Sequence, residues 1–267
     1  MSGLPVSKAH AYGNDFVFVP ADRVGDNVPA LARTLCHRHH GLGADGLIVH
    51  ELRSRGATMR LWNADGSASE LSGNGLRCLA ALVVRRDGLA PGNASATVTV
   101  ETTAGVKTLD LIAREGERYT FRAAMGQPSD ISRVTIPVFG ATVAATVLSV
   151  GNPQCVVLGP LPDEARFQAL GRALSTHALF PAGTNVEFAQ VEAPDRVRIL
   201  IWERGVGPTT SSGTGASAAA VAAAAHGGAS RRMDVVAPGG TQRVEWLDDG
   251  ISLTGWAEIL FEGLWVR

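Results

Sequence analysis

Lysine is almost absent from this chain of 267 residues, which has only Lys8 and Lys107 among its 24 basic residues. A pyridoxal enzyme needs a lysine for its Schiff base, so only two positions are available for one. The three cysteines, Cys36, Cys78 and Cys155, are too scattered to indicate a disulfide framework or a metal-ligand spacing. We therefore expect a protein that uses neither pyridoxal phosphate nor a metal, and no other cofactor.

The chain also lacks an excess of charge and a long apolar run. Its formal net charge is −1, whereas a nucleic-acid-binding face needs a basic stripe. No stretch reaches the roughly 18 uninterrupted apolar residues of a membrane span, and the N-terminus has no signal-peptide pattern. We expect a cytoplasmic protein whose partner is a small-molecule substrate, with no nucleic acid and no membrane. A homodimer is left open as its assembly.

A serine followed by Gly-x-Gly occurs twice, at residues 72–75 (Ser-Gly-Asn-Gly) and 212–215 (Ser-Gly-Thr-Gly). Each precedes a run that is typical of a helix, so we expect helices at 73–86 and 213–226. The free amides and the positive dipole end of a helix start favour an anion. Two such starts, one in each half, predict a grip on the two sides of one small acid.

Other polar residues repeat in step with these serines. Residues 13–15 (Gly-Asn-Asp) lie 59 residues before the first serine, and residues 151–153 (Gly-Asn-Pro) lie 61 before the second. Asn63 and Glu203 each stand nine residues before their serine. A constant offset of about 140 residues predicts two similar domains.

Short alternating runs with turn residues between them predict many strands and few helices. With no apparent βαβ rhythm, this pattern indicates an α+β fold with antiparallel sheets. We place the domains at 1–118 and 119–262, with 263–267 returning to the first. The periodic runs alone predict helices over 29–37, 75–86, 164–174 and 215–225. The serine-glycine starts extend the second and fourth of these to 73–86 and 213–226.

Three further patterns carry less weight. Residues 41–46 match the dinucleotide fingerprint Gly-x-Gly-x-x-Gly, but a basic segment precedes them and a strand follows, so a turn is the better interpretation. Residues 36–40 (Cys-His-Arg-His-His) are too crowded for one tetrahedral zinc site and indicate the polar end of a helix. Neither serine has the Gly-x-Ser-x-Gly elbow of a hydrolase, which leaves that activity open but unsupported.

Glu203 and Arg204 end a predicted strand and enter a glycine-rich loop just before the second serine. A surface ion pair is one interpretation. The other is recognition of an amino acid, with Glu203 on the ammonium and Arg204 on the carboxylate, since arginine binds carboxylates with a planar fork. We favour the second because the pair leads directly into the predicted anion site.

Together these segments resemble diaminopimelate epimerase and the wider family of cofactor-independent amino-acid racemases. The resemblance implies two pseudo-symmetric, strand-rich, barrel-like domains, each around a central helix, with the site in the cleft between them. It also implies a biosynthetic isomerase acting on a small amino-acid-type or carboxylate-bearing substrate. The matching segments are 8–16, 38–46, 63–67, 73–78, 151–153, 185–188, 203–207, 213–216, 238–240 and 254–255.

The chain departs from that family at the two positions that perform its chemistry. There, one cysteine thiolate takes the α-proton and a second thiol returns a proton to the opposite face, and these cysteines match Ser72 and Ser212. A thiol pKa lies near 8.5 and a hydroxyl pKa nearer roughly 15. About seven units at 1.36 kcal/mol each is roughly 9 kcal/mol of lost basicity, and a helix end restores at most about 2 kcal/mol. The serines cannot simply replace the thiols.

Further positions differ too. Gln154 stands where the family has a histidine, Pro208 where it has a glutamate, and Tyr12 where it has a smaller residue. We expect catalytic roles for Ser72, Ser212, Glu203 and Tyr12. The expected substrate-binding residues are Asn14, Asn63, Gly73, Asn74, Asn152, Gln154, Asn185, Arg204, Gly213 and Thr214.

The predicted function is a diaminopimelate-epimerase-like isomerase without the two-thiol chemistry. Three alternatives stay open: a repurposed lyase or cyclase of a biosynthetic pathway, an epimerase inactivated by deliberate Cys→Ser changes, and a non-catalytic amino-acid-binding protein. Deliberate inactivation would not need Gln154, Pro208 or Tyr12, so these residues favour a natural relative with altered chemistry.

Overall fold

The structure, a computed structural model, describes residues 3–69, 71–92 and 96–266, which form two compact units. Unit 1 holds the described residues up to Ala123 and those from Gly255 onward, and unit 2 spans Ala124–Thr254. The strands β8 (Arg118–Gly126) and β17 (Gly250–Trp265) carry the chain from one unit to the other. Each of these strands lies partly in both units, so both unit boundaries fall within a continuous strand. The sequence pattern placed the boundaries at 118 and 263 instead.

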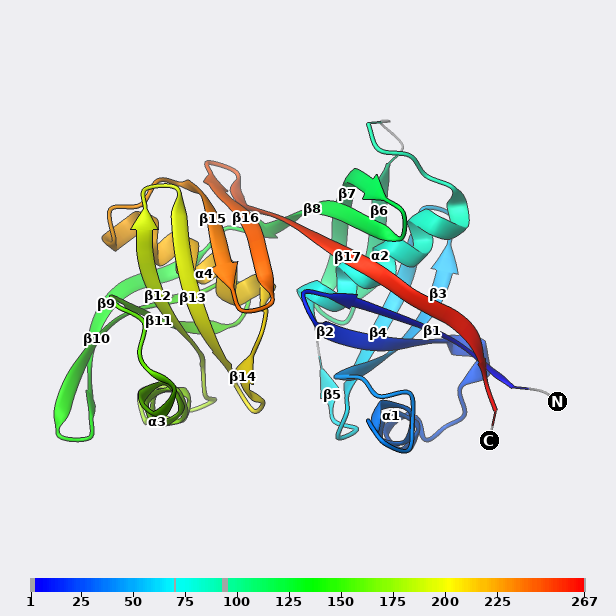
Figure 1. Ribbon diagram of the computed structural model, residues 1–267, viewed down its shortest axis with the longest axis horizontal. Coiled ribbons are helices and arrows are strands. Elements are labelled where there is room, and N and C mark those ends of the chain that lie inside the picture. The colour runs from blue at the N-terminus through cyan, green and yellow to red at the C-terminus, as the bar shows by residue number, and fades with distance from the viewer. Residues whose placement is uncertain (1–2, 70, 93–95, 267) are drawn as a thin grey trace. The chain divides into compact units, whose positions relative to one another are not determined.

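Unit 1 is a barrel around one helix (Figure 1). The strands pair in the order β17, β1, β2, β3, β4, β6, β7 and β8, and the pairing of β8 with β17 closes the sheet. Inside it, every residue of α2 (Gly73–Asp87) from Asn74 to Val84 is buried, as expected of a core helix. The remaining elements are β1 (Leu4–Ala11), β2 (Asn14–Pro20), the 3-10 turn η1 (Ala21–Arg23), α1 (Val28–Cys36), β3 (Gly46–Arg53), β4 (Gly56–Asn63), β5 (Ala68–Ser69), β6 (Thr97–Thr102) and β7 (Gly105–Glu115).

Unit 2 repeats this arrangement. Its strands pair in the order β9, β10, β11, β12, β13, β15, β16 and the first part of β17. The alanine-rich helix α4 (Gly213–His226) is buried from Gly215 to Ala223 and packs against most of these strands. The remaining elements are β9 (Ser129–Val138), β10 (Ala141–Ser149), β11 (Pro153–Leu158), α3 (Glu164–Ser175), β12 (Asn185–Ala193), β13 (Arg196–Glu203), β14 (Gly207–Thr209), β15 (Arg232–Ala237) and β16 (Gly240–Leu247).

The expected fold class, two similar strand-rich domains around central helices, is confirmed, but the expectation of purely antiparallel sheets is wrong. Among the described residues, the pairs β2 with β3, β4 with β6, β11 with β12, and β13 with β15 are parallel. The helices α1 to α4 each lie in one of the four crossovers, because parallel neighbours need a long connection. The hairpins of the remaining strands dominate the sequence pattern and hide this rhythm.

The glycine-rich segment 41–46 is a loop between α1 and β3, as the sequence indicated. The backbone N–H groups of Leu42 and Gly43 donate to the carbonyl of Leu35 at 2.8 and 3.0 Å. A Cβ on Gly41 would lie 2.2 Å from the carbonyl oxygen of Thr34, so only glycine fits. His37 closes the same helix end. Its Nδ1 accepts the backbone N–H groups of His39 and His40, at 3.1 and 3.0 Å.

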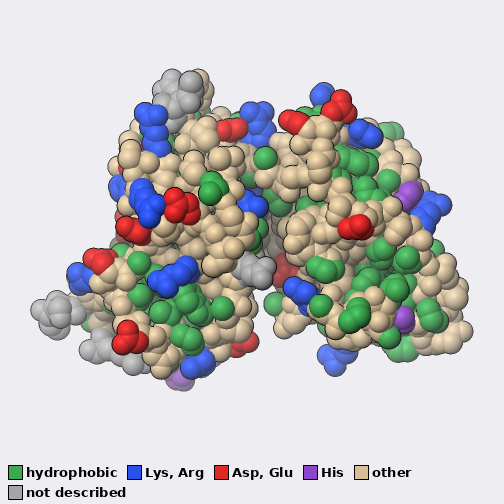
Figure 2. Space-filling view, turned by 180° about the vertical axis from the view of Figure 1, so that it is seen from behind, with side chains coloured by type: hydrophobic (Ala, Val, Ile, Leu, Met, Phe, Trp, Pro, Cys, Tyr) green, Lys and Arg blue, Asp and Glu red, His purple; other side chains and the backbone are tan. Residues whose placement is uncertain are grey.

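The surface of each unit is mixed in charge. Figure 2 shows lysine and arginine side chains interspersed with aspartate and glutamate on the face that it presents. No helix in the described part of the chain is long and apolar enough to cross a membrane.

Candidate functional site

The two serines singled out by the sequence cap the two central helices in the same way. Ser72 and Ser212 have extended backbones, with φ/ψ of −133°/121° and −141°/129°. The Ser72 hydroxyl accepts the N–H of Gly75 at 3.1 Å, and the Ser212 hydroxyl accepts that of Gly215 at 3.2 Å. Each hydroxyl therefore satisfies one of the amides that a helix start leaves unpaired.

These helix starts keep their positive character. Neither α2 nor α4 has an acidic residue in its first turn. With the third amide satisfied by serine, the positive dipole end of each helix remains suited to an anion.

In unit 1 a chain of hydrogen bonds fixes the side chains next to the helix start. Asn74 Nδ2 donates to Asn14 Oδ1 at 3.1 Å, and Asn14 Nδ2 donates to Asp45 Oδ2 at 2.8 Å. The buried Arg77 donates to Asn74 Oδ1 from one turn further along α2. The structure thus brings the predicted residues Asn14 and Asn74 together and orients both.

A cluster of charges that sequence reasoning did not identify supports this chain. Asp15 forms an ion pair with Lys8 at 2.9 Å and accepts two hydrogen bonds from Arg38, at 2.9 and 3.2 Å. Arg38 also reaches Asp45 at 2.7 Å. Burial alone would raise the pKa of Asp15, but the hydrogen bonds from Arg38 and Lys8 bring it below its ordinary value. Unlike charges in two matching segments were the only signal for the cluster.

Tyr12 is packed inside unit 1 and is poorly placed as a base. It is 2% exposed, with a backbone φ of 58°. Its ring lies 4.4 Å from that of Trp256, and its hydroxyl accepts the backbone N–H of Trp256 at 3.1 Å. Burial raises the pKa of the Tyr12 hydroxyl. The geometry gives this residue a packing role, which departs from the catalytic role that we expected.

Asn63 closes the turn that follows β4. Its Nδ2 donates to Ser67 Oγ at 2.9 Å, and its backbone N–H donates to the Ser67 carbonyl at 2.8 Å. Its side chain is thus already engaged, and a role in substrate binding stays a prediction.

In unit 2 the corresponding residues form a shorter chain. Gln154 Nε2 donates to Asn152 Oδ1 at 2.6 Å, and Asn152 Nδ2 donates to Thr214 Oγ1 at 3.4 Å. The hydroxyls of Thr214 and Ser212 are 3.4 Å apart. The structure therefore gathers these four predicted residues around the start of α4.

Asn185 holds the loop that carries Arg204. Its Oδ1 accepts the Arg204 N–H at 2.9 Å, and its Nδ2 donates to the Pro153 carbonyl at 3.3 Å. The Arg204 side chain is exposed and donates to the Ala182 carbonyl at 3.1 Å. Glu203 is half-buried at the end of β13. The pair is built into the loop, with Glu203 half-buried and Arg204 exposed.

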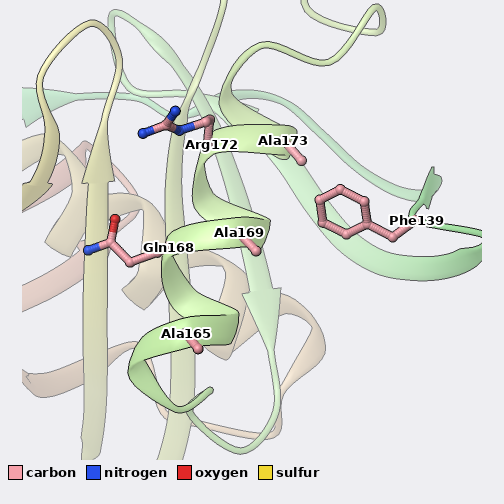
Figure 3. A pocket seen from close by; sticks show the side chains of 6 residues that line it. All are labelled: Phe139, Ala165, Gln168, Ala169, Arg172 and Ala173. Atoms are coloured by element: carbon pink, nitrogen blue, oxygen red, sulfur yellow. The ribbon is translucent and has the colours of Figure 1, made fainter.

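A separate depression of about 460 Å³ lies on the outer helix α3 of unit 2 (Figure 3). Phe139, from the β9–β10 turn, stands beside the alanines of α3, and Gln168 and Arg172 point away from the same helix. None of the predicted site residues lines it, so we do not place the substrate there.

Solved structures define the class of the fold. A predicted epimerase of Pseudomonas aeruginosa superposes with a TM-score of 0.75 at 16% identity, over 99% of both chains. A probable proline racemase of Agrobacterium radiobacter K84 superposes with a TM-score of 0.73 at 16% identity, over 98% of this chain and 93% of the other. The fold is that of the epimerases and racemases.

Sequence comparison narrows this class to one family. The diaminopimelate epimerase of Desulforudis audaxviator is 42% identical, over 99% of this chain and all of its own length, and that of Desulfitobacterium hafniense is 39% identical over 98% of both. The sequence pattern of diaminopimelate epimerase matches residues 6–131 and 146–260. The chain belongs to the diaminopimelate epimerase family. The expected isomerase class is confirmed, whereas the roles of individual site residues stay predictions.

The caps generate a stability prediction. Replacement of Ser72 or of Ser212 by alanine removes the acceptor for one buried amide and should lower the free energy of unfolding by about 1 kcal/mol each. Urea unfolding followed by circular dichroism measures this. Replacement by aspartate, which also caps helices, should restore most of the loss. A neutral effect of both alanine variants would show that the hydroxyls do not stabilise the helix starts.

Proposed function

We propose that this protein is an isomerase acting at the α-carbon of an amino-acid-type substrate, with a substrate carboxylate bound at a serine-capped helix start. The observation that carries the proposal is the pair of serine-capped helices, neither of which has an acid in its first turn. Arg204 is the predicted carboxylate-binding side chain and Glu203 the predicted partner of the ammonium. Membership of the diaminopimelate epimerase family supports the substrate class.

The serines have a different part from the family's thiols in this proposal. Each hydroxyl oxygen already accepts a backbone N–H, and its high pKa makes it a poor base on its own. Ser72 and Ser212 then hold the helix starts in shape and place a hydroxyl beside the substrate. A proton must be stored on another residue.

Binding without catalysis is the second candidate. Gln154 stands where the family has a histidine, and its amide cannot carry a proton at neutral pH. An amino-acid-binding protein would need the carboxylate sites but no acid or base. Proton exchange distinguishes it from an isomerase.

We further propose that the protein is cytoplasmic and dimeric. Its three cysteines are free and buried, which suits a reducing compartment. For the dimer, the support is the end of β17, where Leu260, Phe261 and Leu264 are 49%, 39% and 63% exposed. This stretch pairs with β1 beyond the point where β17 meets β8, and an exposed apolar strand end is suited to a second copy.

The dimer is tested by sedimentation. Leu264→Asp should convert a dimer into a monomer, because it places a charge in the apolar strip. Leu179→Asp, at an exposed leucine of unit 2, is the matched control and should leave the mass unchanged. If the unmodified protein and Leu264→Asp both sediment as monomers at the same concentrations, the proposal is contradicted.

The chemistry is tested by hydrogen exchange in deuterium oxide. The unmodified protein should exchange the α-proton of diaminopimelate slowly or not at all, because it has no thiol at positions 72 and 212. Ser72→Cys combined with Ser212→Cys should raise exchange on the amino acid that the protein accepts. Proton NMR follows the loss of the α-proton signal.

Each outcome has a defined meaning. Rapid exchange on diaminopimelate by the unmodified protein would contradict the slow-exchange prediction and show that another base serves this substrate. No exchange on any amino acid, by either form, would contradict the isomerase proposal and favour the binding protein.

A further inference from the structure

Glu187 is a buried acid to which the proposed function gives no role. Glu187, on β12, is 0% exposed. Neither of its carboxyl oxygens has a hydrogen-bond partner among the described residues. A buried polar group without a partner lowers stability whatever its role, and such groups are found at functional sites.

Glu187 lies against the start of α4, beside the serine cap. A Cβ built on Gly215 would be 2.7 Å from Glu187 Oε1 and 3.2 Å from Ser212 Cβ. The carboxyl group and the serine side chain thus border one and the same point of the first helical turn. Glu187 is the buried acid at the helix start that the sequence predicted as an anion site.

The repeat in unit 1 shows that the fold does not need an acid at this place. A Cβ on Gly75 would be 2.9 Å from Ile48 Cδ1 and 3.4 Å from Ser72 Cβ. Ile48 on β3 and Glu187 on β12 hold matching positions in the repeat. Each lies two residues after the first residue that pairs with the parallel neighbour strand. These first pairs are Gly46 with Phe16 and Asn185 with Gln154. An apolar side chain fills the site in one unit and a carboxyl group in the other.

The groups around Glu187 favour its neutral form. Burial raises the pKa of Glu187 well above its ordinary value, and the charge of Glu203 on β13 raises it further. From β11, Cys155 is a thiol whose own pKa is raised to about 12, by burial and then by Glu187. On α4 the first turn has no acidic residue, and the basic residue of its last turn, His226, lies at the far end.

We propose that Glu187 stores the proton of the second helix start, as a positioning residue that acts through the Ser212 hydroxyl. The inference rests on the proposed isomerase function. Glu187 has no hydrogen bond to Ser212 in the structure, so a side-chain rotation must first bring its carboxyl group to Ser212 Oγ. As Ser212 O–H then passes its proton to the substrate α-carbanion, whose electron pair becomes the new C–H bond, Glu187 passes its own proton to Ser212 Oγ. The serine ends unchanged and Glu187 ends as a carboxylate. In reverse, the carboxylate takes the α-proton through the same hydroxyl, so no free alkoxide forms.

The first test reads the proton itself. Infrared difference spectra of the unmodified protein against Glu187→Gln should show a protonated carboxyl band at pH 7 that disappears as Glu187 titrates at higher pH. The spectra need no substrate. A Glu187 that is already ionised at pH 7 would overturn the inference.

The second test reads the coupling to serine. Ser212→Ala should shift the Glu187 titration midpoint upward by at least about 0.5 pH unit, because it removes the hydroxyl that stabilises the carboxylate. Ser72→Ala, the matched change at the other helix start, should leave the midpoint unchanged. Equal midpoints in all three proteins would show that Glu187 does not act through Ser212.

The third test reads turnover on an amino acid that the unmodified protein exchanges in deuterium oxide. Glu187→Gln should lower kcat by about 100-fold or more with KM unchanged, whereas loss of packing alone would not separate the two. Glu187→Ile, which copies Ile48, should lose the same activity yet raise Tm. The rise in Tm should grow as the pH increases above about 4.5, because the glutamate then ionises in the unfolded chain but not in the folded protein. Full activity in Glu187→Gln would overturn the inference. If the unmodified protein exchanges no amino acid, the isomerase proposal fails and the two titration tests still decide the role of Glu187.

Discussion

Each unit depends on one constraint, which is the hydrogen bonding of the backbone amides at the start of the helix buried inside its barrel. The amide of the third helical residue, Gly75 or Gly215, is buried and must find a partner inside the protein. Ser72 and Ser212 solve this in the same way, each with one hydroxyl oxygen on the third amide of its helix. The glycines that follow let neighbouring strands approach closely, as at Gly215 beside Glu187. What remains at each helix is a positive dipole end, which suits a carboxylate.

The two units add different chemistry to this common frame. Unit 1 surrounds its helix start with amides and a buried cation, Arg77, which donates to Asn74 and lies under the ring of Tyr12. Unit 2 has the acid Glu187 where unit 1 has Ile48, and Gln154 where the repeat gives Phe16. In the proposed function, unit 1 therefore supplies only binding groups at its helix start, and unit 2 also supplies a group that can hold a proton.

Much of the frame was predictable from the sequence, because the helix caps are local signals. The bounds 73–86 and 213–226 agree with α2 and α4 to within one residue, and the repeat predicted the two units. The parallel crossovers were missed, since strand direction depends on contacts between distant segments. Glu187 was passed over inside a matching segment, because an acid in a strand gives no sign of burial. The burial of Tyr12 was not predictable for the same reason, because its hydroxyl bonds to Trp256, which lies far away in sequence.

We propose that the helix start of each unit binds a carboxylate of an amino-acid-type substrate. Amide ¹⁵N–¹H spectra test it directly, with signals from Gly73 and Asn74 in unit 1 and from Gly213 and Thr214 in unit 2. On titration with diaminopimelate, the account predicts that both sets shift and saturate together, whereas cadaverine, the same diamine without carboxylates, moves neither. Shifts that saturate at different concentrations, equal shifts with cadaverine, or no shift at either helix start would contradict it.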